Sequence, residues 1–440
     1  MSAKAVTIGI DIGTTAVKAV AADEDGRVVA RTRIPHQLRV PAPDCLEHDA
    51  DEAWRRGPLA AVEQLARPDA AAVAVTAMVP SLTAVDDVGR PVTSGLLYGD
   101  TRGRGAAFGD ASMFSGETIE FLRWTAQKAP NALGYWPASA VANHALAGEA
   151  VIDNATASTA YPLFDGTRWD EERCAKCGAT ADRMPIVAPT GTAIGHLRGS
   201  DVVLAAGSVD ALCEQLVAGA DRDGDVVVLC GTTLIVWITI PEYREVPGLW
   251  TVPHSTGGKF QIGGPSNAGG LFLSWVDSLV AEDNSVVDPG RVPVWSPYVR
   301  GERVPYHDPD RRAVLDGLNL THGGAAVRRA GYEASGFVVR QLIELSGAPA
   351  TRIVATGGGT RVQPWMQALA DATGLPVEVS AVPEGAALGA AFIGRVAASL
   401  ETSVTDAARW ASADRVLEPD PLWTNAVHDR YVRFRGLAGP

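Results

Sequence analysis

Residues 5–20 read AVTIGIDIGTTAVKAV, two strand-forming runs joined by an unusually polar loop. The first run ends on Asp11, and the loop then supplies Gly13, Thr14 and Thr15 before the chain becomes apolar again. A two-residue hairpin loop needs only Asn-Gly or Asp-Gly, so this loop carries more polar groups than a turn requires. The excess predicts a binding site at the tip of a β-hairpin.

The same pattern recurs near the middle of the chain. The apolar run 226–230 leads into Gly231, Thr232 and Thr233, and a second apolar run follows at 234–240. We call Gly13–Thr15 the first tip and Gly231–Thr233 the second tip. Their spacing indicates a duplicated architecture. Apolar strands alternate with alanine-rich helical stretches, which favours an α/β fold.

Length also favours two domains, because single cores stop growing near roughly 250–300 residues and this chain has 440. The charged cluster at 220–225 is a suitable crossing, which places the domains at 1–220 and 221–440.

Composition narrows the class of protein. The chain is 46% hydrophobic and 20% charged, as in ordinary globular proteins, and no apolar run is long enough to span a membrane. The formal charge of −13 argues against nucleic acid as a partner. Without a secretory signal pattern, we expect a cytoplasmic protein. Cys174 and Cys177 form one C-x-x-C pair without a second, which favours a loop with reduced thiols over a zinc site.

Both tips have the chemistry of phosphate binding. Each offers backbone N–H groups and two hydroxyls, and glycine allows close approach of a phosphate oxygen. An ordinary turn is the alternative for either tip alone, whereas the matched pair favours phosphate. A third loop, the glycine loop Gly357–Thr360, follows the apolar run 353–356, and its three glycines leave room for a nucleotide.

Two charged residues flank the first tip. A carboxylate beside a triphosphate needs a cation between them, so Asp11 is interpreted as a Mg²⁺ ligand. Lys18 lies across the hairpin and faces either the phosphates or solvent; the sequence leaves both open.

The whole chain resembles the FGGY family of carbohydrate kinases. Asp11–Lys18 is similar to the family's first phosphate motif, 231–233 to its second, and 356–359 to its adenosine motif. Three further segments resemble the carbohydrate-kinase signature region: 297–305, 317–322 and 329–333. The resemblance implies duplicated ribonuclease-H-like domains, the actin-like ATPase fold, with a cleft between them, and ATP and Mg²⁺ as cofactors.

The resemblance also implies roles for single residues. Asp210, in Gly207-Ser208-Val209-Asp210, matches the family's catalytic base and is a second metal ligand beside Asp11. The residues alone equally allow a structural role, in which the negative charge of Asp210 stabilises the N-terminal end of its helix. We expect that helix N-terminus to keep Asp210 ionised, a weak base that mainly orients the acceptor hydroxyl. The implied nucleotide-binding residues are Asp11, Gly13, Thr14, Thr15, Lys18, Gly231, Thr232, Thr233, Gly270, Gly357, Gly358 and Gly359.

The acceptor region departs from its relatives. An apolar strand is expected at 71–76. After it, xylulokinase-like members carry Met-His-Gly and glycerol-kinase-like members carry Gln-Arg-Glu, whereas this chain has Met78-Val79-Pro80. Neither Val79 nor Pro80 offers a side-chain donor or acceptor, which disfavours glycerol and D-xylulose. The implied acceptor-binding residues are Met78, Val79, Tyr98, Asp100 and Asp210, with Trp54 and Tyr161 as secondary candidates.

The predicted activity is ATP-dependent phosphorylation of a sugar hydroxyl. The acceptor would be a ketopentose such as xylulose or ribulose, or a related sugar, polyol or sugar acid. Two alternatives stay open: a non-catalytic sugar or nucleotide sensor of the same fold, and an actin-like or heat-shock-chaperone-like ATPase. Family members are often dimers, which leaves a homodimer open.

Overall fold

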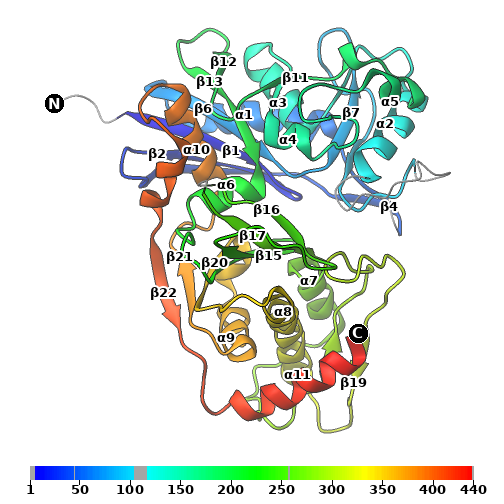
Figure 1. Cartoon of the computed structure of the whole chain (residues 1–440), viewed down its shortest axis with the longest axis vertical. Helices are drawn as coiled ribbons and strands as arrows, with labels where there is room; N and C mark the ends of the chain where they lie inside the picture. The colour runs from blue at the N-terminus through cyan, green and yellow to red at the C-terminus, as the bar shows by residue number, and fades with distance from the viewer. Residues whose placement is uncertain (1–4, 44, 104–115, 256–257, 439–440) are drawn as a thin grey trace. The chain divides into compact units, whose positions relative to one another are not determined.

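The computed structural model describes residues 5–43, 45–103, 116–255 and 258–438 (Figure 1). The chain divides into two compact units: unit 1 is Met1–Val217 with Ala386–Trp410, and unit 2 is Ala218–Gly385 with Ala411–Pro440. The first crossing lies within three residues of the predicted one at 220/221. The sequence-based division nevertheless assigned 386–410 to the second domain, and the structure packs this segment with the first.

Unit 1 is built on a six-stranded sheet with the order β12-β13-β6-β1-β2-β3. Strands β1, β2 and β3 pair antiparallel, β6 pairs parallel with both β1 and β13, and β12 closes the edge antiparallel. The strands are β1 (Val6–Ile12), β2 (Ala16–Ala22), β3 (Val28–Pro35), β6 (Ala70–Ala77), β12 (Ala193–His196) and β13 (Val203–Val209).

Alternation along β1 determines which helices cover which face of this sheet. Ile8, Ile10 and Ile12 point to a core shared with α1 (Gly57–Leu65) and α3 (Ala138–Ala147). Gly9 faces the other way, where a Cβ would lie 1.7 Å from the carbonyl oxygen of Ala387 in α10 (Gly385–Ala397). Figure 1 shows α10 near β1. Only glycine permits this contact.

A second sheet of unit 1 has the order β4-β5-β8-β7-β9. Its strands are β4 (Arg39–Ala42), β5 (Cys45–His48), β7 (Ser81–Val85), β8 (Gly95–Leu97) and β9 (Gly134–Trp136). A separate core lies against it, with contributions from α2 (Gly116–Lys128), α4 (Asn154–Ser158) and α5 (Glu171–Lys176). The remaining elements of unit 1 are η1 (Asp51–Arg56), β10 (Val151–Asp153), η2 (Ala181–Arg183), β11 (Ile186–Ala188), α6 (Asp210–Leu216) and η4 (Val404–Trp410).

The C-x-x-C pair lies in this second core. Cys174 belongs to α5 and Cys177 caps it, so the predicted loop is a short helix. Both thiols are free and buried, and burial raises the pKa of each to about 11. Among the described residues, no group of three or more histidine, cysteine or acidic side chains is arranged to hold a metal ion.

Unit 2 repeats the strand order of unit 1 and adds one edge strand, β16. Its seven-stranded sheet has the order β16-β17-β15-β14-β20-β21-β22, in which β17 to β22 correspond to β3-β2-β1-β6-β13-β12 of unit 1. The antiparallel hairpin, the parallel strands β20 and β21 and the antiparallel edge strand β22 recur in the same sequence. The strands are β14 (Asp225–Cys230), β15 (Leu234–Ile240), β16 (Trp250–Pro253), β17 (Phe260–Ser266), β20 (Arg352–Thr356), β21 (Val377–Ser380) and β22 (Ala413–Leu417). The predicted duplication is therefore visible in the topology.

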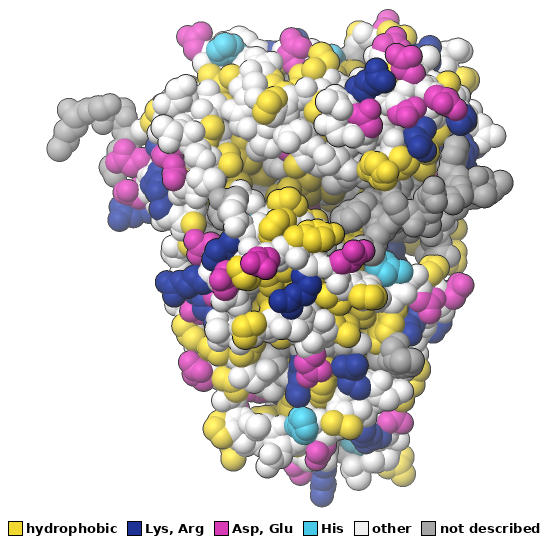
Figure 2. All heavy atoms as spheres, viewed as in Figure 1, with side chains coloured by type: hydrophobic (Ala, Val, Ile, Leu, Met, Phe, Trp, Pro, Cys, Tyr) yellow, Lys and Arg dark blue, Asp and Glu magenta, His cyan; other side chains and the backbone are white. Residues whose placement is uncertain are grey.

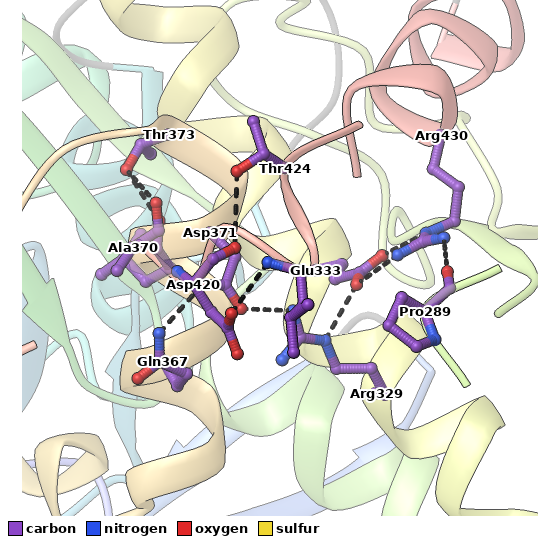
Figure 3. Close-up of polar contacts among 12 residues, drawn as sticks. Pro289, Arg329, Glu333, Gln367, Ala370, Asp371, Thr373, Asp420, Thr424 and Arg430 are labelled. Carbon is purple, nitrogen blue, oxygen red and sulfur yellow. Dashed lines mark hydrogen bonds and ion pairs between the residues drawn. The ribbon is translucent and has the colours of Figure 1, made fainter. Parts of the chain in front are cut away.

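Four helices form the core of unit 2 together with its sheet. They are α7 (Gly270–Leu279), α8 (Gly324–Ser346), α9 (Gln363–Thr373) and α11 (Thr424–Ala438), with β18 (Val294–Ser296), β19 (Val314–Asp316) and η3 (Gly358–Arg361) beside them. A buried ionic network joins three of these helices (Figure 3). Glu333 of α8 accepts two hydrogen bonds from Arg430 of α11, at 2.6 and 2.8 Å, and one from Arg329. Arg329 also reaches Asp371 of α9 at 2.7 Å.

Charged side chains of both signs share one face of the molecule. On the face drawn in Figure 2, lysine and arginine side chains are interspersed with aspartate and glutamate. Over the described ranges, no helix combines the length and the apolar character needed to cross a bilayer.

We predict that Arg430→Met destabilises the protein far more than Arg433→Met in the same helix. The first change leaves Glu333 buried without its bidentate partner, at a cost of about 3–5 kcal/mol. The second breaks an exposed pair with Asp316, worth at most about 1 kcal/mol. Chemical denaturation of the full chain measures both, and equal losses would contradict the role given to Glu333.

Candidate active site

Parallel pairing collects the candidate residues of unit 1 at one edge of its sheet. Asp11 lies opposite Thr76 of β6, and Thr76 lies opposite Ser208 of β13. The carboxyl ends of these strands therefore meet, and α6 begins there with Asp210. The structure thus brings together the two aspartates that the sequence placed about 200 residues apart.

Asp11 is buried, and its two carboxylate oxygens have different surroundings. Oδ2 lies 3.6 Å from the Nζ atom of Lys18, which pairs with Asp11 across the hairpin. Oδ1 is buried and has no hydrogen-bond partner among the described residues. Burial raises the pKa of Asp11, and the positive charge of Lys18 opposes that rise. Lys18 thus contacts Asp11, and a contact with phosphate stays a prediction.

Asp210 is the first residue of α6, and its Oδ1 accepts a hydrogen bond from Ala211 N at 2.7 Å. Burial raises its pKa to about 7, and the nearby charge of Asp11 adds to the rise. The hydrogen bond from Ala211 lowers the pKa but does not outweigh these two causes. The raised pKa contradicts the expectation that the helix N-terminus keeps Asp210 ionised as a weak base. Desolvation and a like charge dominate.

The pair of aspartates fits a divalent cation held jointly with phosphate. Asp11 has an unpartnered buried oxygen, and repulsion between Asp11 and Asp210 is what a cation relieves. Mg²⁺ is commonly bound through one or two carboxylates together with substrate phosphates, rather than in an all-protein cage. The two carboxylates of this edge match that donor set.

The first tip is held by contacts from three different strands or loops. Gly13 N donates to Ala16 O at 3.1 Å, which closes the turn. The hydroxyls of Thr14 and Tyr98 share a hydrogen bond of 2.9 Å. His48 Nε2 lies 2.8 Å from the carbonyl oxygen of Thr14, and His36 N donates to the carbonyl oxygen of Thr15 at 3.1 Å. The side chain of Thr15 is left exposed.

The second tip and the glycine loop share the corresponding edge in unit 2. Strands β14 and β20 run parallel, with Leu229 opposite Thr356, so both loops follow at the same carboxyl edge. Helix α7 begins against the second tip, where Gly270 N donates to Gly231 O at 2.8 Å. A Cβ on Gly270 would lie 2.8 Å from that same oxygen. Gly270 therefore supports the second tip, as a glycine must at this close approach.

The three glycines of the glycine loop have different surroundings. Gly357 has a φ of +89°, which favours glycine. A Cβ on Gly359 would lie 2.2 Å from Cζ3 of Trp365 and 2.7 Å from Cys230 O. Gly358 has no atom within 4 Å of its Cβ position. Two glycines are thus needed for the fold, and Gly358 borders open space that a ligand can occupy.

The acceptor-binding candidates separate into two groups. Met78 and Val79 directly follow β6, whose last residue Ala77 pairs with Val209, so they lie at the edge that carries Asp210. Val79 and Pro80 also line a small cavity of about 20 Å³.

Asp100, by contrast, is fully buried. It accepts hydrogen bonds from Leu46 N at 2.6 Å and from the guanidinium of Arg102 at 2.7 Å, so its carboxylate is used inside the protein. The indole of Trp54 is also fully buried, whereas Tyr161 is exposed.

Glu302 supports this site, although the sequence analysis named only the segment 297–305 that contains it. Glu302 is buried and accepts hydrogen bonds from Ser266 Oγ at 2.7 Å and Asn267 N at 2.9 Å. It thereby holds the loop that leads to Gly270. Burial raises the pKa of Glu302 to about 7, against these hydrogen bonds. Only the resemblance of 297–305 to a family signature signalled it.

Family models describe both halves of this chain. The model for the N-terminal domain of the FGGY family of carbohydrate kinases matches residues 6–107, and the model for the C-terminal domain matches 226–398. The chain belongs to this family. The predicted resemblance, the α/β actin-like fold and the kinase class are confirmed, because the relatives of this FGGY chain are kinases.

Three relatives show the extent of the similarity. The chain is 26% identical over 448 residues to the gluconokinase of Bacillus subtilis, covering 88% of this chain and 86% of the relative. It is 23% identical over 473 residues to the xylulose kinase of Escherichia coli, covering 98% of each. The crystal structure of a xyloylose kinase from Brucella ovis matches with a TM-score of 0.81 and 25% identity over 98% of both chains.

We predict that Gly359→Ala lowers stability, whereas Gly358→Ala weakens the binding of ATP without affecting stability. The first forces a methyl group into Trp365 and Cys230, so it should lower the free energy of unfolding by about 1–3 kcal/mol. The second meets no atom and should leave stability unchanged while raising the KM for ATP. Thermal unfolding and initial rates test both, and destabilisation by Gly358→Ala alone would contradict the geometry.

Proposed function

We propose that this FGGY kinase transfers the γ-phosphoryl group of ATP to a hydroxyl of a sugar, polyol or sugar acid, with Asp210 as the general base. The observation that carries the proposal is the pairing of Asp11 and Asp210 at the carboxyl edge of parallel strands, beside the first tip. Kinases of this family use ATP.

Each unit contributes a part suited to phosphate. The second tip and the glycine loop would bind the nucleotide, because Gly358 borders open space beside that tip. The first tip would bind the terminal phosphates through its backbone N–H groups and its exposed Thr15 hydroxyl. Asp11 and Asp210 would hold Mg²⁺, which neutralises charge on the phosphoryl oxygens.

Asp210 is suited to receive the proton of the acceptor hydroxyl. Without a bound cation, burial and the charge of Asp11 raise its pKa to about 7, close to neutral pH. A bound cation would favour the ionised form that accepts the proton. Because phosphoryl transfer has a loose transition state, orienting the hydroxyl toward phosphorus remains a large part of this role.

The range of acceptors that we propose is inferred from the side chains near Asp210. Val79 and Pro80 present no donor or acceptor, so one side of the bound sugar would meet an apolar surface. A site with few hydrogen-bonding groups discriminates weakly between related sugars. We therefore propose a broad acceptor range that includes sugar acids and ketopentoses.

A coupled assay of ADP release across pentoses, ketopentoses, polyols and sugar acids tests the activity. Sugar-dependent ADP release supports the kinase proposal. ADP release without any sugar would instead support an ATPase, and silence across the panel would support a sensor.

We predict that Asp210→Asn lowers kcat by about 10²–10⁴-fold and leaves nucleotide binding intact, because the amide cannot accept the proton. Asp170→Asn is the matched control, since Asp170 caps the N-terminus of α5 through a hydrogen bond from Arg173 N. Initial rates and calorimetric titration with ATP measure the two effects. Near-normal turnover in Asp210→Asn would exclude it as the base.

We predict that Val79→His shifts preference toward D-xylulose. An added donor at this position gives about one net hydrogen bond, so the ratio of kcat/KM for D-xylulose over D-gluconate should rise about fivefold. Val79→Leu supplies bulk without a donor and should leave the ratio unchanged. Equal shifts in the two variants would show that shape, not hydrogen bonding, governs this position.

A further inference from the structure

A buried chain of hydrogen bonds runs from Trp54 to the first tip. Trp54 Nε1 donates to His48 Nδ1 at 3.0 Å, and His48 Nε2 lies 2.8 Å from the carbonyl oxygen of Thr14. Trp54 and His48 are both fully buried. His48 ends β5 and Trp54 lies in η1, so neither belongs to the hairpin that they support.

The partners of His48 fix its tautomer. An indole N–H can only donate, so Nδ1 of His48 must carry a lone pair. A carbonyl oxygen can only accept, so Nε2 must carry the proton. The two contacts agree on one neutral form, and the opposite tautomer would place two donors together at Nδ1 and two lone pairs together at Nε2.

The surroundings keep His48 neutral. Burial lowers its pKa to about 4. The titratable or charged groups that face it are His36 and Arg39, and both oppose its protonation. The ring of His36 packs edge-on against His48, with centroids 4.4 Å apart. His48 is therefore an N–H donor of constant form at neutral pH.

We propose that His48 is a positioning residue for phosphoryl transfer, which holds the first tip in its phosphate-binding shape while Trp54 fixes its tautomer. This inference rests on the proposed function, in which the first tip binds the terminal phosphates. The hydrogen bond to the Thr14 carbonyl orients the Thr14–Thr15 peptide, and with it the N–H group of Thr15. Tyr98, in the turn that follows β8, shares a hydrogen bond with the Thr14 hydroxyl, which leaves this peptide to His48.

Three variants test the inference. His48→Leu removes the donor, and we expect it to raise the KM for MgATP about tenfold with little change in the KM of the acceptor. His48→Gln places an amide N–H where Nε2 was, and it should restore most of the affinity for MgATP. Trp54→Phe keeps the ring but frees Nδ1, and it should raise the KM for MgATP less than His48→Leu.

The tautomer provides a readout that packing alone would not change. Long-range ¹H–¹⁵N spectra of the imidazole should show the Nε2–H form alone in the wild type and a mixture in Trp54→Phe. This measurement also applies if His48→Leu fails to fold. An Nδ1–H form in the wild type, or equal KM values for MgATP in the leucine and glutamine variants, would overturn the inference.

A separate variant distinguishes failure of this inference from failure of the proposed function. Thr15→Glu places a negative charge on the exposed side of the first tip without touching His48, so it should strongly raise the KM for MgATP. If it does so and His48→Leu does not, the positioning role is wrong and the phosphate role stands. If Thr15→Glu has no effect, the first tip does not bind phosphate and both proposals fall.

Discussion

Parallel pairing of strands from distant parts of the sequence is the constraint on which the site depends. In unit 1, β6 lies between β1 and β13, so the ends of all three strands meet at one edge. In unit 2, β14 and β20 do the same for the second tip and the glycine loop. Each functional loop follows the last residue of a buried strand, which fixes its origin rigidly. The loops themselves remain free to carry glycine, hydroxyl and carboxylate groups.

Burial then sets the chemistry of the groups gathered there. Asp11 is buried and Asp210 is partly buried beside it, and their mutual repulsion adds to the cost of ionisation. Lys18 offsets part of this cost for both. The arrangement is under-neutralised in the protein alone, and this property suits the proposed binding of a cation beside the phosphates. A carboxylate fully paired with a basic side chain would have little affinity left for a cation.

Much of this was predictable because the relevant patterns are local. The two Gly-Thr-Thr tips, the strand before Asp11 and the helix after Asp210 are each visible within a few residues. Three features were not. The pKa of Asp210 depends on burial and on Asp11, which the fold brings near. Asp100 accepts hydrogen bonds from Leu46 N and Arg102, and His48 contacts Trp54 and the Thr14 carbonyl. All three are tertiary contacts, which sequence spacing does not encode.

The return of Ala386–Trp410 to unit 1 has a consequence for synthesis on the ribosome. Gly9 needs α10 against it, and Glu214 of α6 accepts a hydrogen bond from Ala386 N at 2.8 Å. Helix α10 leaves the ribosome only after nearly the whole chain has been made. Until then, Gly9 of β1 and Glu214 of α6 lack their contacts with α10. A gene fragment that stops at residue 220 would lack these contacts permanently.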